Sequence, residues 1–414
     1  MHAFTAAFLA ALLFATATQC WLAWRHMRHV AARRNAVPEE FRDRIPLEAH
    51  QKAADYTLAR TRLSLIETLV GAVVALGFTL GGGLEALARA WSGVFEAGGY
   101  AHGIALLLSM AFVAGLFDVP FSIYRTFRIE AHFGFNRMSL PLWLGDLAKS
   151  TVLSLIIGVP LLYLVLWLMK GMGSHWWLYV WIAAMAFILM ANGVAPLIMM
   201  WFNKFSPLEN GELRSRIEGL LTQCGFRSRG LFVMDGSKRS THGNAFFAGL
   251  GKSKRIVFFD TLLKNLSADE IEAVLAHELG HFSRGHLWKR MGFMAVTSLT
   301  LLWILAWLMG NPWFYTALGA QSESTAMALA LFSVAAPPFT FILSPLFNQL
   351  SRRHEYEADA YAAAHAPAQD LVRALVKLYQ DNASTLTPDP LHSAFYDSHP
   401  PASLRIARLN QAGA

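Results

Sequence analysis

The sequence predicts a mostly α-helical integral membrane protein with seven transmembrane helices and a soluble α+β part. Three observations predict this class. The composition is 55% hydrophobic and only 15% charged, whereas soluble globular proteins carry about 25% charged residues. The apolar residues gather in long windows, and the basic residues gather in alternate segments between them. We therefore expect much of the chain to face lipid.

Seven windows are long and apolar enough to cross a membrane as helices. A crossing helix needs about 20 apolar residues to span the ~30 Å hydrocarbon layer. The main alternative for the first window is a cleaved signal peptide, but such a peptide carries positive charge in front of its apolar core, and here Arg25 and Arg28 follow it. The predicted spans are residues 3–24, 63–82, 101–117, 147–169, 176–200, 291–309 and 325–347.

The distribution of Lys and Arg predicts the orientation of these helices, because basic residues concentrate in cytoplasmic loops. With the N-terminus outside, 33 of the 35 Lys and Arg residues fall in inner segments, and only Arg89 and Lys170 fall outside. Both long soluble segments are then expected on the cytoplasmic face. The inner segments are residues 25–62, 118–150, 203–290 and 349–414, with 9, 4, 14 and 6 basic residues.

Charge and cysteine content exclude several other classes. The net charge of +7 follows from the topology, and no basic motif interleaved with aromatic residues suggests a nucleic-acid partner. The two cysteines, Cys20 and Cys224, lie in a membrane helix and a soluble segment, so we expect neither a disulfide framework nor a cysteine-based zinc site. The lipid bilayer is the expected partner of the basic surface.

The chain divides into four predicted parts. Residues 1–202 form a membrane domain with five transmembrane helices, and residues 203–290 form a cytoplasmic segment with a helix that carries the pattern HExxH. Residues 291–348 hold two more transmembrane helices, and residues 349–414 form a C-terminal cytoplasmic segment with further His, Glu and Asp residues. In the last span, Pro337, Pro338 and Pro345 predict a kink, because proline removes a backbone donor.

The soluble segment is predicted to contain a small sheet between two helices. Residues 212–226 have the apolar spacing of a helix, and short aromatic and β-branched runs at 231–235, 244–250 and 255–260 predict two or three strands. Ser267 and Glu270 then form a capping box, which marks the start of the next helix.

That helix carries the most informative motif of the chain, HExxH at residues 277–281. Positions i and i+4 of a helix lie about 40° apart around the axis and ~6 Å along it, so His277 and His281 can reach one ion. Glu278 is then placed to act on the water that zinc activates. The alternative is a solvent-facing helix with incidental histidines, but its apolar neighbours and Gly280, which lets another segment approach closely, favour the metal site.

A catalytic zinc needs a third protein ligand. His286 is near, but the extended motif HExxHxxGxxH would need Gly and His where Arg284 and Leu287 stand, so we reject it. Glu355 is the better candidate, and Asp359 on the same predicted helix face can accept a hydrogen bond from a ligand histidine. Glu357 and His354 are expected to point elsewhere.

Four segments together resemble a known family. "GNAFFAGLGKSKRIVFFDTLL", "EIEAVLAHELGHFSRGH", "SRRHEYEADAYA" and "YDSHPPASLRIARL", in this order around two membrane helices, resemble the type I CAAX prenyl proteases. These are integral-membrane zinc metalloendopeptidases, and the resemblance runs over essentially the whole chain. It implies a zincin-like protease domain on the cytoplasmic side and seven helices that enclose a water-filled chamber.

The resemblance also implies a role for individual residues. One zinc ion per chain would be held by His277, His281 and Glu355, with Glu278 as general base and Asp359 behind the ligands. Asn244 would align an extended peptide at an edge strand, which can pair with a substrate as an added strand. His399 and Arg405 would stabilise the oxyanion and hold the substrate beside the zinc; from the residues alone, His399 could equally belong to an ordinary loop.

We therefore expect a membrane zinc endopeptidase that cuts peptides near the cytoplasmic face, including removal of the C-terminal tripeptide from prenylated peptides. The end "LNQAGA" without an ER-retention signal and the Ala- and Arg-rich composition favour a bacterial member in the inner membrane, for which a prenylated substrate is not assured. The alternatives are a protease for quality control of misfolded membrane proteins, a non-catalytic membrane scaffold, and a transporter that uses the chamber.

Overall fold

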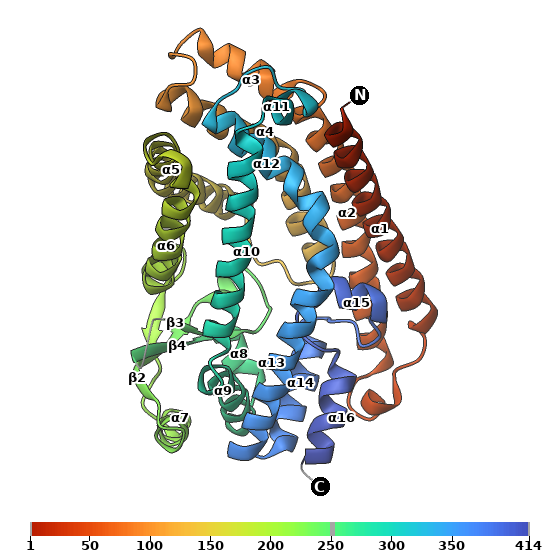
Figure 1. The fold of residues 1–414 in the computed structure, drawn as a ribbon. Coiled ribbons are helices and arrows are strands. Elements are labelled where there is room, and N and C mark those ends of the chain that lie inside the picture. The colour runs from red at the N-terminus through yellow and green to blue at the C-terminus, as the bar shows by residue number, and fades with distance from the viewer. Residues whose placement is uncertain (1, 249–252, 413–414) are drawn as a thin grey trace.

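The computed structural model describes residues 2–248 and 253–412. Long helices run between two ends of the molecule, and the chain termini lie at opposite ends (Figure 1). The short helices α3 (Gly83–Ser92) and α11 (Pro312–Ala317) cap the end near the N-terminus. A small sheet and a group of helices occupy the other end (Figure 1).

The predicted number of membrane helices is confirmed, because seven helices within the described residues are long and apolar enough to cross a membrane. The chain is therefore an integral, multi-pass membrane protein. The first six spans are α1 (Ala3–Arg33), α2 (Leu47–Phe78), α4 (Tyr100–Tyr124) continued by the π-helical turn Arg125–Glu130, α5 (Leu140–Gly171), α6 (Trp176–Met199) and α10 (His286–Met309).

The second span ends earlier than the predicted window of residues 63–82. Helix α2 stops at Phe78, and Gly82 adopts a positive φ of 74°. Glycine takes this left-handed conformation at little cost, and a Cβ at Gly81 or Gly83 would come within 2.8 Å or 2.7 Å of the Gly77 carbonyl oxygen. The glycine run therefore turns the chain sharply, although hydropathy alone continues through it.

The seventh span is interrupted where the prolines predicted a kink. Helix α12 (Thr325–Thr340) passes through the 3₁₀ turn Phe341–Leu343 into α13 (Ser344–His365). Pro345 lies in the first turn of α13, where proline costs little. Our division at 348/349 falls inside α13, and that at 290/291 falls inside α10. Helices α10 and α13 thus each continue across a predicted boundary between the membrane part and the soluble part.

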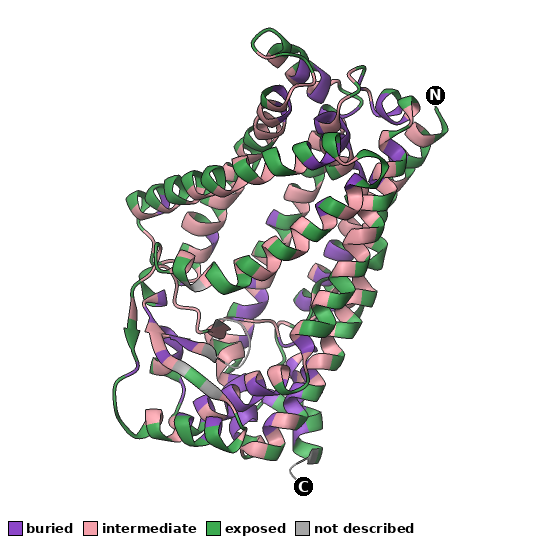
Figure 2. Ribbon diagram, turned by 60° about the vertical axis from the view of Figure 1, so that its left-hand side comes forward, coloured by how far each residue is buried: buried purple, intermediate pink, exposed green. Residues whose placement is uncertain are grey.

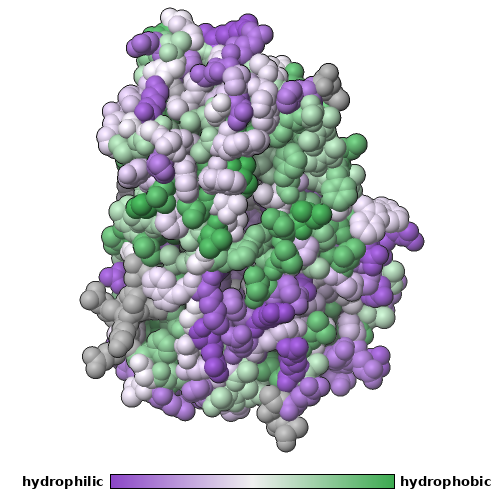
Figure 3. Space-filling model, viewed as in Figure 1, coloured by the Kyte–Doolittle hydropathy of each residue, from purple (hydrophilic) through white to green (hydrophobic). Residues whose placement is uncertain are grey.

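The membrane helices enclose a chamber and do not form a tightly packed bundle. In every one of the seven spans, no more than 33% of the most apolar window is buried inside the protein. The middle of these helices is mostly exposed or half-buried, and buried residues gather at the two ends (Figure 2). A band of hydrophobic surface crosses the middle of the molecule and gives way to hydrophilic surface at the sheet end (Figure 3), as expected for lipid contact.

The soluble part contains a four-stranded sheet in the order β1-β2-β4-β3. Strands β2 and β4 are parallel, and the two outer pairs are antiparallel. Two or three strands were predicted from three runs, and each run contains a strand, although residues 249 and 250 of the run 244–250 lie outside the described residues; β1 was not predicted. The strands are β1 (Phe205–Pro207), β2 (Arg227–Met234), β3 (Ala245–Ala248) and β4 (Ser253–Phe259).

Helices pack against this sheet and around α13 to form the core of the soluble part. Its most buried side chains include Ile217, Ile256, Phe258 and Ile271, each at most 2% exposed. The helices are α7 (Glu212–Gln223), α8 (Asp260–Asn265), α9 (Ala268–Ser283), α14 (Ala368–Asp381), α15 (Pro390–Tyr396) and α16 (Ala402–Ala412), and short 3₁₀ turns occur at Glu39–Phe41, Gly173–His175 and Gly236–Lys238.

The close contact between α9 and α13 depends on small residues. A Cβ at Gly280 would lie 2.9 Å from the Cα atom of Ala358 and 3.1 Å from its carbonyl oxygen. Ala276, Ala358 and Ala362 are almost fully buried in the same region. The predicted close approach at Gly280 is confirmed, and it brings the side chains of α9 and α13 within reach of one another.

Candidate active site

The HExxH motif lies on a helix whose start is firmly fixed. The predicted capping box is present: the Glu270 carboxylate accepts from the Ser267 backbone N–H at 2.8 Å, and the Ser267 hydroxyl accepts from the Glu270 N–H at 3.3 Å. Lys377 of α14 also binds Glu270 at 2.7 Å. The helix therefore presents its C-terminal turns, with His277 and His281, in a defined position against α13.

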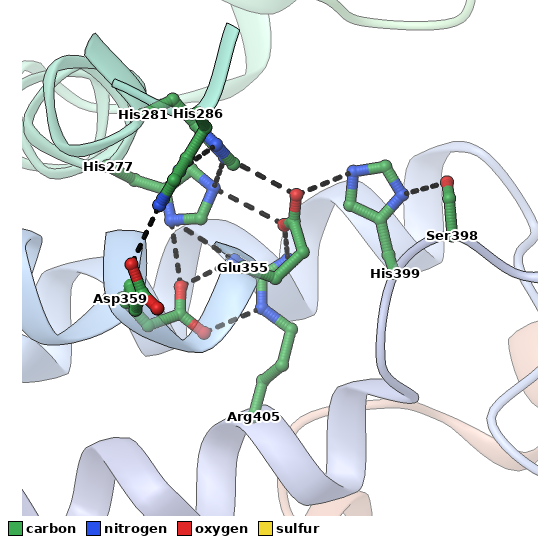
Figure 4. A network of polar contacts seen from close by, with 9 residues as sticks. His277, His281, His286, Glu355, Asp359, Ser398, His399 and Arg405 are labelled. Carbon is green, nitrogen blue, oxygen red and sulfur yellow. Dashed lines mark hydrogen bonds and ion pairs between the residues drawn. The ribbon is translucent and has the colours of Figure 1, made fainter. Parts of the chain in front are cut away.

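His277, His281 and Glu355 form a metal-sized triangle (Figure 4). The two Nε2 atoms are 3.3 Å apart, and they lie 3.5 Å and 3.3 Å from the two Glu355 carboxylate oxygens. Zinc ligands at about 2.0–2.1 Å in tetrahedral geometry are separated by about 3.3 Å. The three groups therefore fit one zinc ion, and no other such group of His, Cys, Asp and Glu occurs in the described part of the chain.

The state of Glu355 also fits a bound cation. Its side chain is only 5% exposed, and its Oε2 atom is a buried oxygen without a hydrogen-bond partner in the described structure. A buried carboxylate is costly unless a cation or hydrogen bonds compensate it. A metal ion between the three groups would supply that compensation.

Behind the triangle, Asp359 and Arg405 support His277. The His277 Nδ1 atom lies 2.8 Å from Asp359, and the Arg405 guanidinium donates two hydrogen bonds to the same carboxylate at 2.9 Å and 2.6 Å. Burial lowers the pKa of His277, but the nearby carboxylates of Asp359 and Glu355 outweigh burial and leave this pKa above its ordinary value. The expected hydrogen bond from a candidate ligand histidine to Asp359 is present.

The other side of the triangle is open. A cavity of about 900 Å³ is lined by Glu278, His281, Glu355 and His399. The His399 side chain is 63% exposed, and its Nε2 atom lies 3.4 Å from Glu355. Glu278 is half-buried, one position after His277 on α9. A substrate can reach the candidate metal site and Glu278 from this cavity.

Asn244 directly precedes the edge strand β3. The last backbone hydrogen bond of the β3–β4 pair runs from the Phe259 N–H to the Asn244 carbonyl at 2.9 Å. In the described sheet only β4 pairs with β3, so the other edge of β3 carries no further strand there. Phe246 and Phe247 of β3 also line the 900 Å³ cavity, which places this edge beside the open side of the triangle.

Two features of the site were not anticipated from the sequence. Arg405 is only 7% exposed and lies behind the candidate ligands, bound to Asp359 and 3.7 Å from Glu355, and it is not in the open cavity. His286 and Glu357, which we set aside, contact each other at 2.9 Å, and His286 contacts His281. In the sequence, the only signal for the second feature was a glycine, Gly285, directly before His286. In the structure Gly285 has a positive φ of 66°, which lets the chain bring His286 back over α9.

Two imidazoles from one helix and a carboxylate from another, set beneath the free edge of a small sheet, are the arrangement of zinc metallopeptidases. Here the arrangement is placed at one end of a seven-helix membrane chamber. The protein is thus an integral-membrane zinc metalloendopeptidase. Comparison with known proteins assigns it to one family within this class.

Comparison with known families and proteins points to the CAAX prenyl proteases along nearly the whole chain. A family model described as the CAAX prenyl protease N-terminal region with five membrane helices matches residues 26–204, and peptidase family M48 matches residues 207–412. CAAX prenyl protease 1 of Saccharomyces cerevisiae is 36% identical over 75% of this chain and 72% of its own length. The human CAAX prenyl protease 1 homolog is 31% identical over 97% of this chain and 95% of its own.

A solved structure agrees with these relatives. The crystal structure of Ste24p from S. mikatae matches with a TM-score of 0.93 and 30% identity, over 99% of this chain and 100% of that one. The chain belongs to the CAAX prenyl protease family, peptidase family M48. The predicted family, fold class and zinc dependence are therefore confirmed.

Proposed function

We propose that this protein is a CAAX prenyl protease, which removes a C-terminal tripeptide from prenylated peptides at the cytoplasmic face of its membrane. The observation that carries the proposal is the triangle of His277, His281 and Glu355 with Glu278 beside it on an open cavity. The names of the relatives that cover most of this chain support the substrate class.

In the proposed mechanism His277, His281 and Glu355 would hold one zinc ion, which would polarise the scissile carbonyl and lower the pKa of a water molecule to about 7. Glu278 takes a proton from the attacking water and passes it to the leaving amine nitrogen, as a general base and then a general acid. It lines the cavity, so no rearrangement of α9 is needed to bring its carboxylate to the substrate.

The remaining residues position the peptide and the charge that develops on it. The peptide lies extended along β3 and pairs with its free edge, aligned by Asn244. His399, exposed on the cavity side, donates from Nε2 to the carbonyl oxygen as it becomes negative. Arg405 contributes indirectly, because it holds Asp359 and so the ring of His277.

The cavity supports an apolar group on the substrate. Besides the polar residues of the candidate site, its wall includes Phe246, Phe293, Phe347 and Leu350, from three different elements. An isoprenoid chain that leaves the bilayer could rest against these side chains while the peptide bond lies at the zinc. A protease for quality control of misfolded membrane proteins would show no preference for such a group.

A cleavage assay with matched peptides tests this proposal. Purified protein should cleave a farnesylated CAAX peptide at least about tenfold faster, in kcat/KM, than the same peptide with an unmodified cysteine, the equivalent of about 1.4 kcal/mol. Equal rates on both peptides would support the general protease, and cleavage of neither would contradict the proposed activity. Treatment with a chelator should abolish cleavage, and added zinc should restore it.

The orientation is part of the proposal, because 33 of the 35 basic residues belong to segments on the proposed cytoplasmic side. After replacement of Cys20 and Cys224, single cysteines at the exposed positions 40 and 323 should label from opposite sides of the membrane. Labelling of position 40 from outside the cell would contradict the orientation. If the source is bacterial, as we expect from composition, the membrane is the inner membrane.

A further inference from the structure

The two candidate ligand histidines are held by different partners. The outer nitrogen of His277, Nδ1, lies 2.8 Å from a carboxylate, that of Asp359. The outer nitrogen of His281 lies 3.0 Å from another imidazole nitrogen, Nδ1 of His286. The other nitrogen of His286 lies 2.9 Å from a carboxylate oxygen of Glu357. A neutral side chain thus stands between the second histidine and its carboxylate.

These contacts fix the proton positions along the chain. A histidine that gives Nε2 to a metal carries its proton on Nδ1, so His281 must be the donor to His286. The Nδ1 atom of His286 must then accept, which leaves its own proton on Nε2. That proton points to Glu357, whose ionised carboxylate can only accept. When a metal is bound, each of these hydrogen bonds therefore has only one possible donor and one possible acceptor.

The surrounding structure holds His286 in place for this role. Only 5% of its side chain is exposed, and its ring stacks on His354 with centroids 4.2 Å apart and planes 14° apart. Gly285 adopts a positive φ of 66° between α9 and α10, which turns His286 back over His281. Lys289, one turn further along α10, lies 3.4 Å from the same oxygen of Glu357.

We propose that His286 is a positioning residue for zinc, and that Glu357 sets its tautomer. The pair orients the ring of His281 as Asp359 orients that of His277. Both nitrogens of His286 are occupied, so it is not a further ligand. This inference rests on the proposed zinc role of His281 and adds residues from α10 and α13 to the support of the metal.

The experiment compares zinc affinity in four variants of the full-length purified protein by competition with a chelator. His286→Phe keeps a ring but removes both nitrogens, and should weaken zinc binding by about 10–100-fold. His286→Asn keeps an acceptor for His281 and should recover most of that loss. Glu357→Leu, at a position that is 46% exposed, should weaken binding by about 3–10-fold. The matched control His354→Phe keeps the stacking and should stay within about twofold of wild type.

A second readout reports the ligand geometry directly. Cobalt substituted for zinc gives a visible absorption band that depends on the ligand geometry, and His286→Phe should shift it while His354→Phe should not. Unchanged zinc affinity and band in both His286→Phe and Glu357→Leu would overturn the inference, as would an equal loss in His354→Phe. If His286→Phe does not fold, Glu357→Leu decides alone. Wild-type protein that binds no zinc would instead overturn the proposed function.

Discussion

The two sides of the metal triangle differ in burial and in what they offer. Behind His277, the side chains of Asp359 and Arg405 are 5% and 7% exposed and hold each other by two hydrogen bonds. In front, His399 is 63% exposed, and a cavity of about 900 Å³ reaches Glu278. In the proposed function this difference separates two tasks: the rear would hold the metal ligands in place, and the front would admit substrate and move protons. Substitutions on the rear should therefore lower mainly stability and zinc affinity, whereas substitutions on the front should lower mainly the rate of cleavage.

The largest expected effect is on the front, at Glu278. Glu278→Gln should reduce kcat/KM by about a thousandfold or more, because the amide cannot take a proton from water. Zinc content and thermal stability should stay at wild-type values. Kinetics on a farnesylated peptide and metal analysis check both. Glu272→Gln on the same helix is the control and should keep its activity; full activity of Glu278→Gln would remove the general base from the mechanism.

On the rear, Asp359→Ala should mainly lower stability and zinc affinity. The change leaves the Arg405 guanidinium buried without its main partner, which costs about 3 kcal/mol, since Glu355 at 3.7 Å compensates only in part. Thermal unfolding and chelator competition measure the two losses. The half-buried pair of Arg34 and Asp55, with side chains 36% and 41% exposed and also joined by two hydrogen bonds, is the control: Asp55→Ala should change Tm little. Equal shifts in the two variants would contradict the structural distinction.

His399 lies on the front, and His399→Ala should have an intermediate effect on kcat. Loss of one donor to a developing oxyanion costs about a hundredfold in kcat. Because the side chain is largely exposed, unfolding temperature and zinc affinity should not change. Measurement of kcat and zinc content on the same preparation separates the alternatives. A loss of zinc without a loss of kcat at saturating zinc would assign His399 to metal retention instead.

The smallest expected effect is at the helix contact that joins both sides. Gly280→Ala would place a Cβ 2.9 Å from Ala358 and should destabilise the protein by about 1–2 kcal/mol, after a gain of about 1 kcal/mol in helix propensity. Zinc affinity should fall with stability, because α9 and α13 carry the candidate ligands. Gly292→Ala is the control, since nothing lies within 4 Å of its new Cβ; it should show neither loss.

Features that depend on neighbours in the chain were largely predictable. The capping box at Ser267 and Glu270 is present, because it needs only residues three positions apart. The spacing of His277 and His281 places them on one helix face in the structure. Residues that meet across the fold were harder: Glu355 could be proposed only because HExxH left one ligand missing, and β1 was missed because three residues carry too little periodicity.

By itself, the sequence determined the seven apolar helices, the start of the metal helix and the residue types of the candidate site, since each follows from hydropathy, helical period or ligand chemistry. Only the tertiary structure decided that Arg405 stands behind Asp359, and that His286 and Glu357, not further ligands, stand behind His281. The physical reason is that two of these contacts join residues 46 and 71 positions apart in the chain. The contact between His281 and His286 depends on the positive φ of Gly285. Local patterns cannot specify such distances, because packing between separate helices sets them.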